Sequence, residues 1–212
     1  MKNRTAKIVR ATKEVRIQGR LNLDGSGRGS VSTGVPFLDH MLELFAKHGL
    51  FDLQLKAKGD IQIDLHHTNE DIGLVLGEAF KAALGDKKGI RRMGAAFVPM
   101  DETLATVRSV VDVSGRPHLN WDWSAGRPRD SFRRAKNRSS ARLAAYDLDD
   151  ARHFLESFVT KSEITLHVDV LKAGGDIHHL LESVFKALGR SLRDAVERDS
   201  RVKGVPSTKG TL

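Results

Sequence analysis

Cysteine is absent from the chain, which has 212 residues. Disulfide bonds and thiolate metal ligands are therefore excluded, and the absence indicates a reducing compartment. The first residues lack the apolar segment of a secretory signal, and no run of about 18 apolar residues occurs in the sequence. We therefore expect a soluble, cytoplasmic protein that does not span a membrane.

Positive charge is unevenly distributed along the chain. The formal net charge is +8, and the segment from Gly126 to Arg142 contributes +6 of it, because it has seven basic residues and a single acid, Asp130. A basic surplus suggests nucleic acid or an acidic substrate as a partner. Phe132 is the only aromatic residue within this segment. The segment therefore offers too few aromatic rings to stack with the bases of a single strand, which argues against nucleic acid.

A short histidine and glutamate motif occurs twice in the sequence. The copies are His66-His67-Thr68-Asn69-Glu70 and His178-His179-Leu180-Leu181-Glu182. A lone histidine precedes each copy at nearly the same distance, His40 by 26 residues and His153 by 25. Paired histidines near a helix start can also be surface residues or satisfied core groups. The matched repetition favours a duplicated set of metal ligands instead.

The spacing within each motif suits metal binding on a helix. Residues three and four apart are neighbours on a helix surface, so Glu70 can reach the same ion as His66 or His67. Adjacent histidines point about 100° apart, which makes it hard for one pair to bind a single ion. We therefore expect two ions, each with three histidines and one carboxylate and with open positions for substrate. The candidate ligands are His40, His66, His67, Glu70, His153, His178, His179 and Glu182.

The sequence offers a second candidate for the lone histidine of the second half. His118 lies 60 residues before His178, whereas the corresponding spacing in the first half is 26. The repeat spacing therefore favours His153. His118 and His167 are expected to have structural roles, and which ligands share each ion stays open.

The order of expected elements is similar in the two halves. In the first half, alternating residues predict strands over 7–9, 15–23, 51–57 and 61–63, and helical periodicity predicts helices over 38–48 and 66–84. In the second half we expect strands over 95–98, 103–113, 118–123 and 164–171. Helices are expected from a cap at Asp149-Asp150 through 157, and over 178–197. The fold class is therefore α+β and internally duplicated, with halves 1–94 and 95–212 in one compact unit.

Several basic and hydroxyl residues at expected loops suit a phosphate group. They are Arg92 after the turn at 85–89, Arg116, and Ser207 and Lys209 in the tail. Guanidinium groups donate paired hydrogen bonds to phosphate oxygens, and an ammonium supplies a point charge. Taken singly, each is more often a solvated charge in a turn or at a frayed terminus.

Ten short motifs along the chain occur together, and in the same order, in one protein family. They are Thr12-Lys13-Glu14, Leu21-Asn22-Leu23-Asp24-Gly25-Ser26-Gly27, Phe37-Leu38-Asp39-His40-Met41-Leu42, Lys47-His48-Gly49, His66-His67-Thr68-Asn69-Glu70-Asp71, Gly85-Asp86-Lys87-Lys88-Gly89-Ile90, Pro99-Met100-Asp101-Glu102, Ser114-Gly115-Arg116-Pro117, His178-His179-Leu180-Leu181-Glu182 and Pro206-Ser207-Thr208-Lys209-Gly210. Through these motifs the sequence closely resembles the imidazoleglycerol-phosphate dehydratase family. The resemblance covers nearly the whole chain apart from about 122–145, where an Arg-rich insertion at about 126–146 is expected to form a mobile surface loop.

The resemblance implies a fold, an assembly and a set of site residues. The fold is a duplicated α+β fold of the ribosomal protein S5 domain 2-like type, assembled from trimers into a 24-subunit shell. Two manganese ions per active site lie between subunits and are held by the eight residues already named. Glu14 and His48 match catalytic positions in contact with the substrate, and Arg92, Arg116, Ser207 and Lys209 match the phosphate grip. The family usually has an acid at the position of Leu65. This departure removes no ligand, but it concerns the residues that support the adjacent His66 and His67.

The implied activity is that of a lyase of histidine biosynthesis. It removes water from D-erythro-imidazoleglycerol phosphate to give imidazoleacetol phosphate. The hydrogen to be lost has no neighbouring carbonyl, so the imidazole ring must take the charge, and two cations would stabilise an imidazolate. Loss of the hydroxyl then gives a diazafulvene-like intermediate. Glu14 is the candidate proton carrier, although a metal-bound water could move the proton and Glu14 could be an orienting residue.

Two other functions remain open at this point. A nucleic-acid-binding protein with structural metals would use the Arg-rich insertion. A di-metal phosphate-ester hydrolase would share the ligand chemistry but would release inorganic phosphate, which a dehydratase retains.

Overall fold

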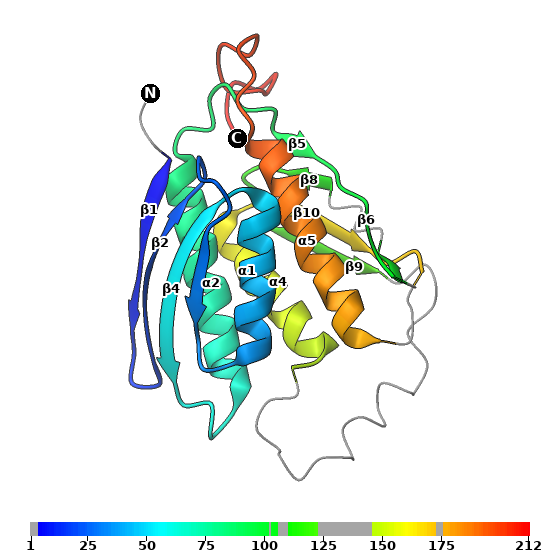
Figure 1. The fold of residues 1–212 in the computed structure, drawn as a ribbon. Coiled ribbons are helices and arrows are strands. Elements are labelled where there is room, and N and C mark those ends of the chain that lie inside the picture. Colours follow the sequence, from blue (N-terminus) through cyan, green and yellow to red (C-terminus); the bar gives the residue numbers. More distant parts are fainter. Residues whose placement is uncertain (1–3, 102, 106–109, 123–145, 173–175) are drawn as a thin grey trace.

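The computed structural model describes residues 4–101, 103–105, 110–122, 146–172 and 176–212. These residues form three layers, in which helices lie between two β-sheets (Figure 1). Most of the Arg-rich insertion expected at 126–146 lies outside the described residues. Tyr146 at its end is described, and its side chain is buried.

The first half supplies one sheet and two helices. Its strands are β1 (Thr5–Ala11), β2 (Val15–Asn22), β3 (Gly29–Ser32) and β4 (Asp52–Gly59), in the order β1-β2-β4-β3. Strands β1, β2 and β4 are antiparallel neighbours, and β3 runs parallel to β4. Helix α1 (Pro36–Gly49) follows β3, and helix α2 (Leu65–Leu84) follows β4.

The second half repeats this arrangement. Its strands are β5 (Met93–Gly94), β8 (Val110–Asp112), β9 (His118–Asp122) and β10 (Thr165–Asp169), in the order β5-β8-β10-β9, with β9 parallel to β10. Helix α4 (Leu148–Ser162) precedes β10, and helix α5 (Ile177–Val196) follows it. An additional pair, β6 (Val98–Met100) and β7 (Thr103–Ala105), has no counterpart among the described residues of the first half. The matching strand orders confirm the duplicated α+β fold.

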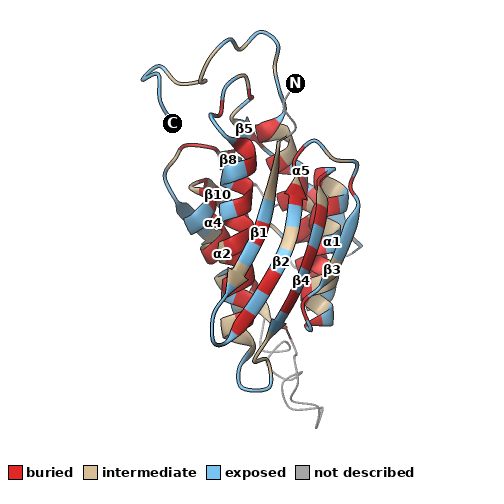
Figure 2. Cartoon of the chain, turned by 90° about the vertical axis from the view of Figure 1, so that its left-hand side faces the viewer, coloured by how far each residue is buried: buried red, intermediate tan, exposed pale blue. Residues whose placement is uncertain are grey.

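The local sequence explains these elements. Along β2, Val15 and Ile17 are buried while Arg16 and Gln18 are exposed, which is the alternation of a sheet with one face on the core (Figure 2). Helix α1 has proline in its first turn, where the missing N–H has no helical partner to lose.

Three expectations from the sequence were wrong. The strand expected over 95–98 does not form, because β5 ends at Gly94 and β6 begins only at Val98. Residues 61–63 form a turn rather than a strand, because the Ile63 N–H donates to the Asp60 carbonyl at 2.7 Å. Helix α4 is capped by Asp147, not by Asp149-Asp150. Asp147 accepts from two backbone N–H groups, and Asp150 completes the capping box. The expected division at residues 94 and 95 stays a prediction, and β5 at Met93–Gly94 pairs within the second sheet.

The helices pack across the two halves. The crossing of α1 and α5 places Gly49 against Gly189, where a Cβ on Gly189 would lie 2.5 Å from the Phe45 carbonyl oxygen. The crossing of α2 and α4 is the equivalent contact and uses Gly73 and Gly77. Each first-half helix therefore lies beside a second-half helix, which brings residues far apart in sequence together.

An ion pair fastens the start of β1. The Arg4 guanidinium donates to Asp24 at 2.6 Å and also to the Val196 carbonyl at 2.5 Å. The hydrogen bond from Arg4 lowers the pKa of Asp24.

Among the described residues, no helix combines the length and the apolar character that crossing a bilayer requires.

We expect Asp24→Asn to lower the free energy of unfolding by roughly 0.5 kcal/mol at pH 7, a small effect because Asp24 is partly exposed. A carboxylate with a lowered pKa stabilises the fold above its unfolded pKa of about 3.9, and this stabilisation is lost as pH falls through the folded pKa. Denaturant titrations at pH 7 and pH 3 should therefore show a difference from the wild type that shrinks with acid. An equal difference at both pH values would contradict the assignment.

Candidate metal centre

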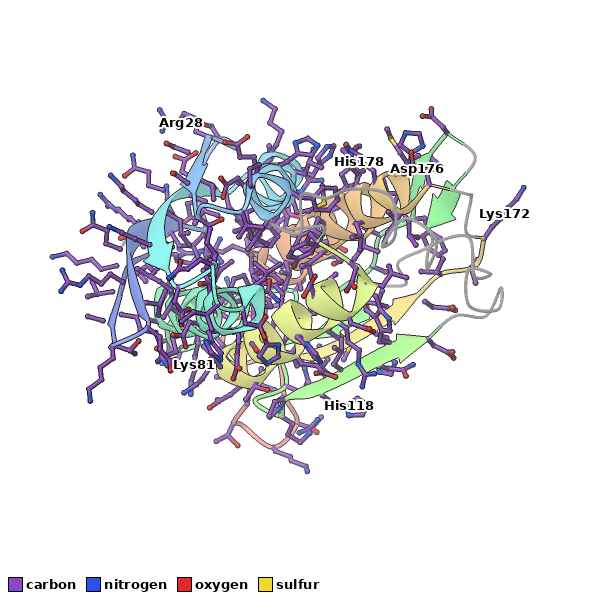
Figure 3. The ribbon with its side chains drawn as sticks, turned by 90° about the horizontal axis from the view of Figure 1, so that it is seen from below. Arg28, Lys81, His118, Lys172, Asp176 and His178 are labelled. Carbon is purple, nitrogen blue, oxygen red and sulfur yellow. The ribbon has the colours of Figure 1, made fainter. Side chains whose placement is uncertain are left out.

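Both histidine pairs lie in the first turn of a helix, for the same local reason. The Asp64 side chain accepts a hydrogen bond from the His66 backbone N–H at 2.9 Å and caps α2. Asp176 accepts from the His178 N–H at 2.8 Å and caps α5 (Figure 3). The repeated Asp-x-His sequence therefore starts each helix at the same point of the motif.

Three of the candidate ligands meet between α1 and α5. The Nε2 atoms of His40 and His178 lie 2.8 Å and 2.9 Å from the same oxygen of Glu182. One ligand atom from each of the three lies within 4.8 Å of the others. His40 belongs to the first half and the other two to the second, so here the lone histidine of one half joins the pair of the other.

Glu182 is held ionised in this group. Burial opposes ionisation, but hydrogen bonds from Lys186, His40 and His178 outweigh it and lower the pKa of Glu182 to about 2. The Lys186 Nζ lies 2.6 Å from the second Glu182 oxygen. Lys186 was missed in the sequence, although its spacing of four residues after Glu182 on a helix is the signal that could have found it.

The chemistry of this donor set fits a divalent cation. Two imidazole nitrogens and an ionised carboxylate oxygen converge on one point, and this combination suits manganese and similar first-row metals. Three protein ligands leave open positions on a six-coordinate ion. His40, His178 and Glu182 are therefore the residues that would hold a metal ion here.

A second group has the equivalent position between α2 and α4. The His66 Nε2 lies 3.5 Å from a Glu70 oxygen, and the His66 and His153 rings are 4.8 Å apart and nearly perpendicular. His153 is the lone histidine of the second half, so this group also combines the motif of one half with the lone histidine of the other. His118, the competing candidate, lies on β9 with its ring 5.8 Å from that of His167.

The remaining two histidines do not join the groups of their own chain. The His67 Nδ1 lies 3.3 Å from an Asp60 oxygen, and the His179 Nε2 lies 3.8 Å from an Asp101 oxygen. Leu65 is the first residue of α2 and packs partly against the hydrophobic core, so it brings no polar group to the adjacent histidines.

The two candidate catalytic residues lie in different places. Glu14 is exposed in the turn between β1 and β2, near His67, whose pKa is raised by the hydrogen bond to Asp60 and further by the charge of Glu14. His48 lies in the last turn of α1. Partial burial and then the charges of Lys186 and two arginines of α5 lower the pKa of His48, which favours its neutral form.

The expected phosphate residues lie around the C-terminal end of α5. The Arg92 guanidinium binds both oxygens of Asp112, at 2.6 Å and 3.0 Å, and donates to the Pro206 carbonyl at 2.9 Å. This places it beside Ser207, whose hydroxyl accepts from the Lys209 backbone N–H.

Arg116 lies in the turn after β8, next to Gly115. A Cβ on Gly115 would lie 2.7 Å from the last residue of the tail, Leu212. Arg92 and the turn that carries Arg116 therefore lie beside the C-terminal tail, which carries Ser207 and Lys209.

The group that contains His178 and the phosphate candidates of one chain lie far apart. The Arg92 backbone N–H donates to the Ala195 carbonyl at 2.8 Å, near the end of α5. His178 lies in the first turn of the same helix. Ala195 follows His178 by 17 positions, which is about 25 Å at a rise of about 1.5 Å per residue. One small substrate cannot reach both ends of the helix.

The duplicated α+β fold and the group of His40, His178 and the buried, ionised Glu182 define a class of protein, an enzyme with a candidate metal centre. The sequence profile described as imidazoleglycerol-phosphate dehydratase matches residues 33–192. The chain belongs to this family of hydro-lyases of histidine biosynthesis.

Relatives and solved structures agree over nearly the whole chain. The imidazoleglycerol-phosphate dehydratase of Aromatoleum aromaticum is 51% identical over 99% of this chain and 100% of its own length. That of Geobacillus kaustophilus is 52% identical over 99% of both chains. Crystal structures of the Staphylococcus aureus and Pyrococcus furiosus enzymes have TM-scores of 0.72 and 0.73 at 33% and 31% identity, covering 92% and 96% of this chain and 99% of each of theirs.

Proposed function

We propose that this chain removes water from D-erythro-imidazoleglycerol phosphate to give imidazoleacetol phosphate, with two manganese ions per active site. The family membership gives the reaction class. The observation that carries metal dependence is the convergence of His40, His178 and ionised Glu182 on one point. The proposal places the reaction in the cytoplasm and has a small phosphate ester as its substrate.

The active site of this proposal forms between copies of the chain. The phosphate candidates lie about 25 Å along α5 from His178, so a neighbouring copy must supply one of the two sets. The printed carboxylate contacts of His67 and His179 are with Asp60 and Asp101, and neither histidine belongs to the group of His40, His178 and Glu182. In this proposal, the two histidines complete the ligand set of a neighbouring copy. A homo-oligomer follows, for which we propose the 24-subunit shell built from trimers.

The chemistry uses the substrate ring to hold negative charge. When bound, the two ions supply positive charge that stabilises an imidazolate. Expulsion of the side-chain hydroxyl from the ring anion gives a diazafulvene-like intermediate, and loss of the neighbouring proton gives the enol of the product. Glu14, exposed in its turn beside His67, would carry that proton. His48, largely neutral, would contact the substrate.

The phosphate residues have a positioning role in this proposal. Arg92 is already oriented by Asp112, so its guanidinium is held in place before substrate binds. Ser207, Lys209 and Arg116 would add donors around the same phosphate.

Incubation of the protein with imidazoleglycerol phosphate and manganese tests the proposed reaction. We expect formation of the ketone imidazoleacetol phosphate with the phosphate ester intact. Release of inorganic phosphate without ketone would instead identify a phosphate-ester hydrolase. RNA retention with no turnover would favour the nucleic-acid-binding alternative.

We expect His178→Ala to remove activity and to weaken assembly together, because His178 is a proposed ligand of an ion that bridges subunits. Activity and the sedimentation coefficient should be measured on the same sample, with His118→Ala as the control because His118 lies outside both groups. A variant that stays fully assembled without bound metal would refute the link between metal binding and assembly.

A further inference from the structure

His67 has a carboxylate partner, Asp60, that is not one of the eight candidate ligands. Asp60 follows β4, and its backbone carbonyl accepts hydrogen bonds from the N–H groups of Ile63 at 2.7 Å and Asp64 at 3.4 Å. The turn that carries Asp60 is therefore fixed. Its side-chain Oδ2 lies 3.3 Å from the Nδ1 of His67, so this contact joins the turn to the first turn of α2.

The Asp60 carboxylate is mostly buried, with its side chain 14% exposed. Its other oxygen, Oδ1, is buried and has no hydrogen-bond partner among the described residues. A carboxylate is costly to remove from water unless it is paired. His67 is the residue that offsets this cost, so the pair is the reason for an acid at this position.

His179, the counterpart of His67 in the second half, has a different carboxylate contact. The His179 Nε2, rather than its Nδ1, lies nearest to Asp101, at 3.8 Å, which is too long for a hydrogen bond. The Asp101 side chain is 67% exposed. The two histidines therefore differ in their carboxylate contacts, although their motifs match in sequence.

We propose that Asp60 is a positioning residue that orients His67 for a metal ion of a neighbouring copy. By accepting a hydrogen bond from the Nδ1–H, Asp60 fixes the tautomer in which the Nε2 lone pair is free and holds this nitrogen on the side of the ring away from Asp60. This inference rests on the proposed function, because it requires the metal centre. It assigns a role to a residue outside the eight candidate ligands.

Manganese titration of the metal-free protein tests this role without any turnover. Binding followed by equilibrium dialysis and by the electron paramagnetic resonance of free manganese should resolve two classes of site per chain in the wild type. We expect Asp60→Ala to weaken one class by roughly 10- to 100-fold and to leave the other unchanged. Asp60→Asn, whose amide oxygen can still accept a hydrogen bond, should weaken the same class less.

Asp64→Asn is the matched control. It removes a negative charge from the same turn, and asparagine still caps the helix at the His66 N–H. Both manganese classes should keep their wild-type affinities. An equal loss in Asp64→Asn and Asp60→Asn would overturn the proposal, because charge alone would then explain the effect.

A double-mutant cycle separates positioning from a general structural effect. If Asp60 acts through His67, the double variant Asp60→Ala/His67→Ala should bind manganese as weakly as His67→Ala alone. Additive losses, equal weakening of both classes, or an unchanged Asp60→Ala would each overturn the inference. A wild type that binds two ions but forms no ketone would refute the proposed reaction alone, whereas a wild type that binds no manganese would refute both.

Discussion

Replacing Glu182 by glutamine should lower activity by more than ~100-fold, because even the loss of a residue that only supports a metal ligand costs ~10–100-fold. Glu182 accepts from His40 and His178 through one oxygen and from Lys186 through the other. A neutral amide cannot supply an anionic ligand, and its NH₂ group would face one of these donors.

The metal content of two variants should distinguish the two ligand groups. We expect Glu182→Gln to lose the ion of its own group, and Glu70→Gln to lose the ion near His66 and His153. Elemental analysis of dialysed protein, run beside the activity assay, measures both effects. Glu156→Gln is the control, because Glu156 is partly exposed and pairs with Arg152 on the same helix. A Glu182→Gln variant that keeps two ions and wild-type turnover would contradict the proposed ligand.

Much of the fold could be predicted from the sequence because the repeat leaves a local trace. Helical periodicity and capping signals predicted the four helices of the described residues, and the start of α2 lies within one residue of the expected position. The segment 61–63 was misread because alternation of apolar and polar residues is also compatible with a turn. The hydrogen bond from the Ile63 N–H to the Asp60 carbonyl closes that turn. Aspartate at the first position of a turn is the signal that the alternation outweighed.

The pairing of ligands could not be predicted, because it depends on how the helices cross. In sequence, His40 is nearest to the first histidine pair, yet it contacts Glu182 of the second. That contact follows from the packing of α1 against α5 at Gly49 and Gly189, which join residues about 140 positions apart. Asp60 was missed because its contact with His67 depends on the conformation of the turn before α2, which brings its carboxylate to the histidine.

The packing of aromatic rings in the helix layer predicts that the two halves of the chain unfold together. Phe158 of α4 is 1% exposed, and its ring contacts Phe45 of α1 and Phe80 of α2 at centroid distances of 6.3 Å and 5.7 Å. These rings come from both halves of the chain and lie in the helix layer between the sheets. We expect Phe158→Ala to lower the free energy of unfolding by about 3–5 kcal/mol, since it removes a buried ring and leaves a cavity.

Denaturant titration followed by circular dichroism measures the loss. The protein concentration is kept fixed, because the proposed assembly would make stability depend on concentration. Phe97→Ala is the matched control, since Phe97 is 63% exposed and its loss should change stability by less than about 0.5 kcal/mol. Phe158→Leu gives a smaller loss and covers the case in which the alanine variant does not fold. A single transition that shifts as a whole is expected, because a shared core couples the two sheets. Two transitions, only one of which moves, would mean that each half has a core of its own.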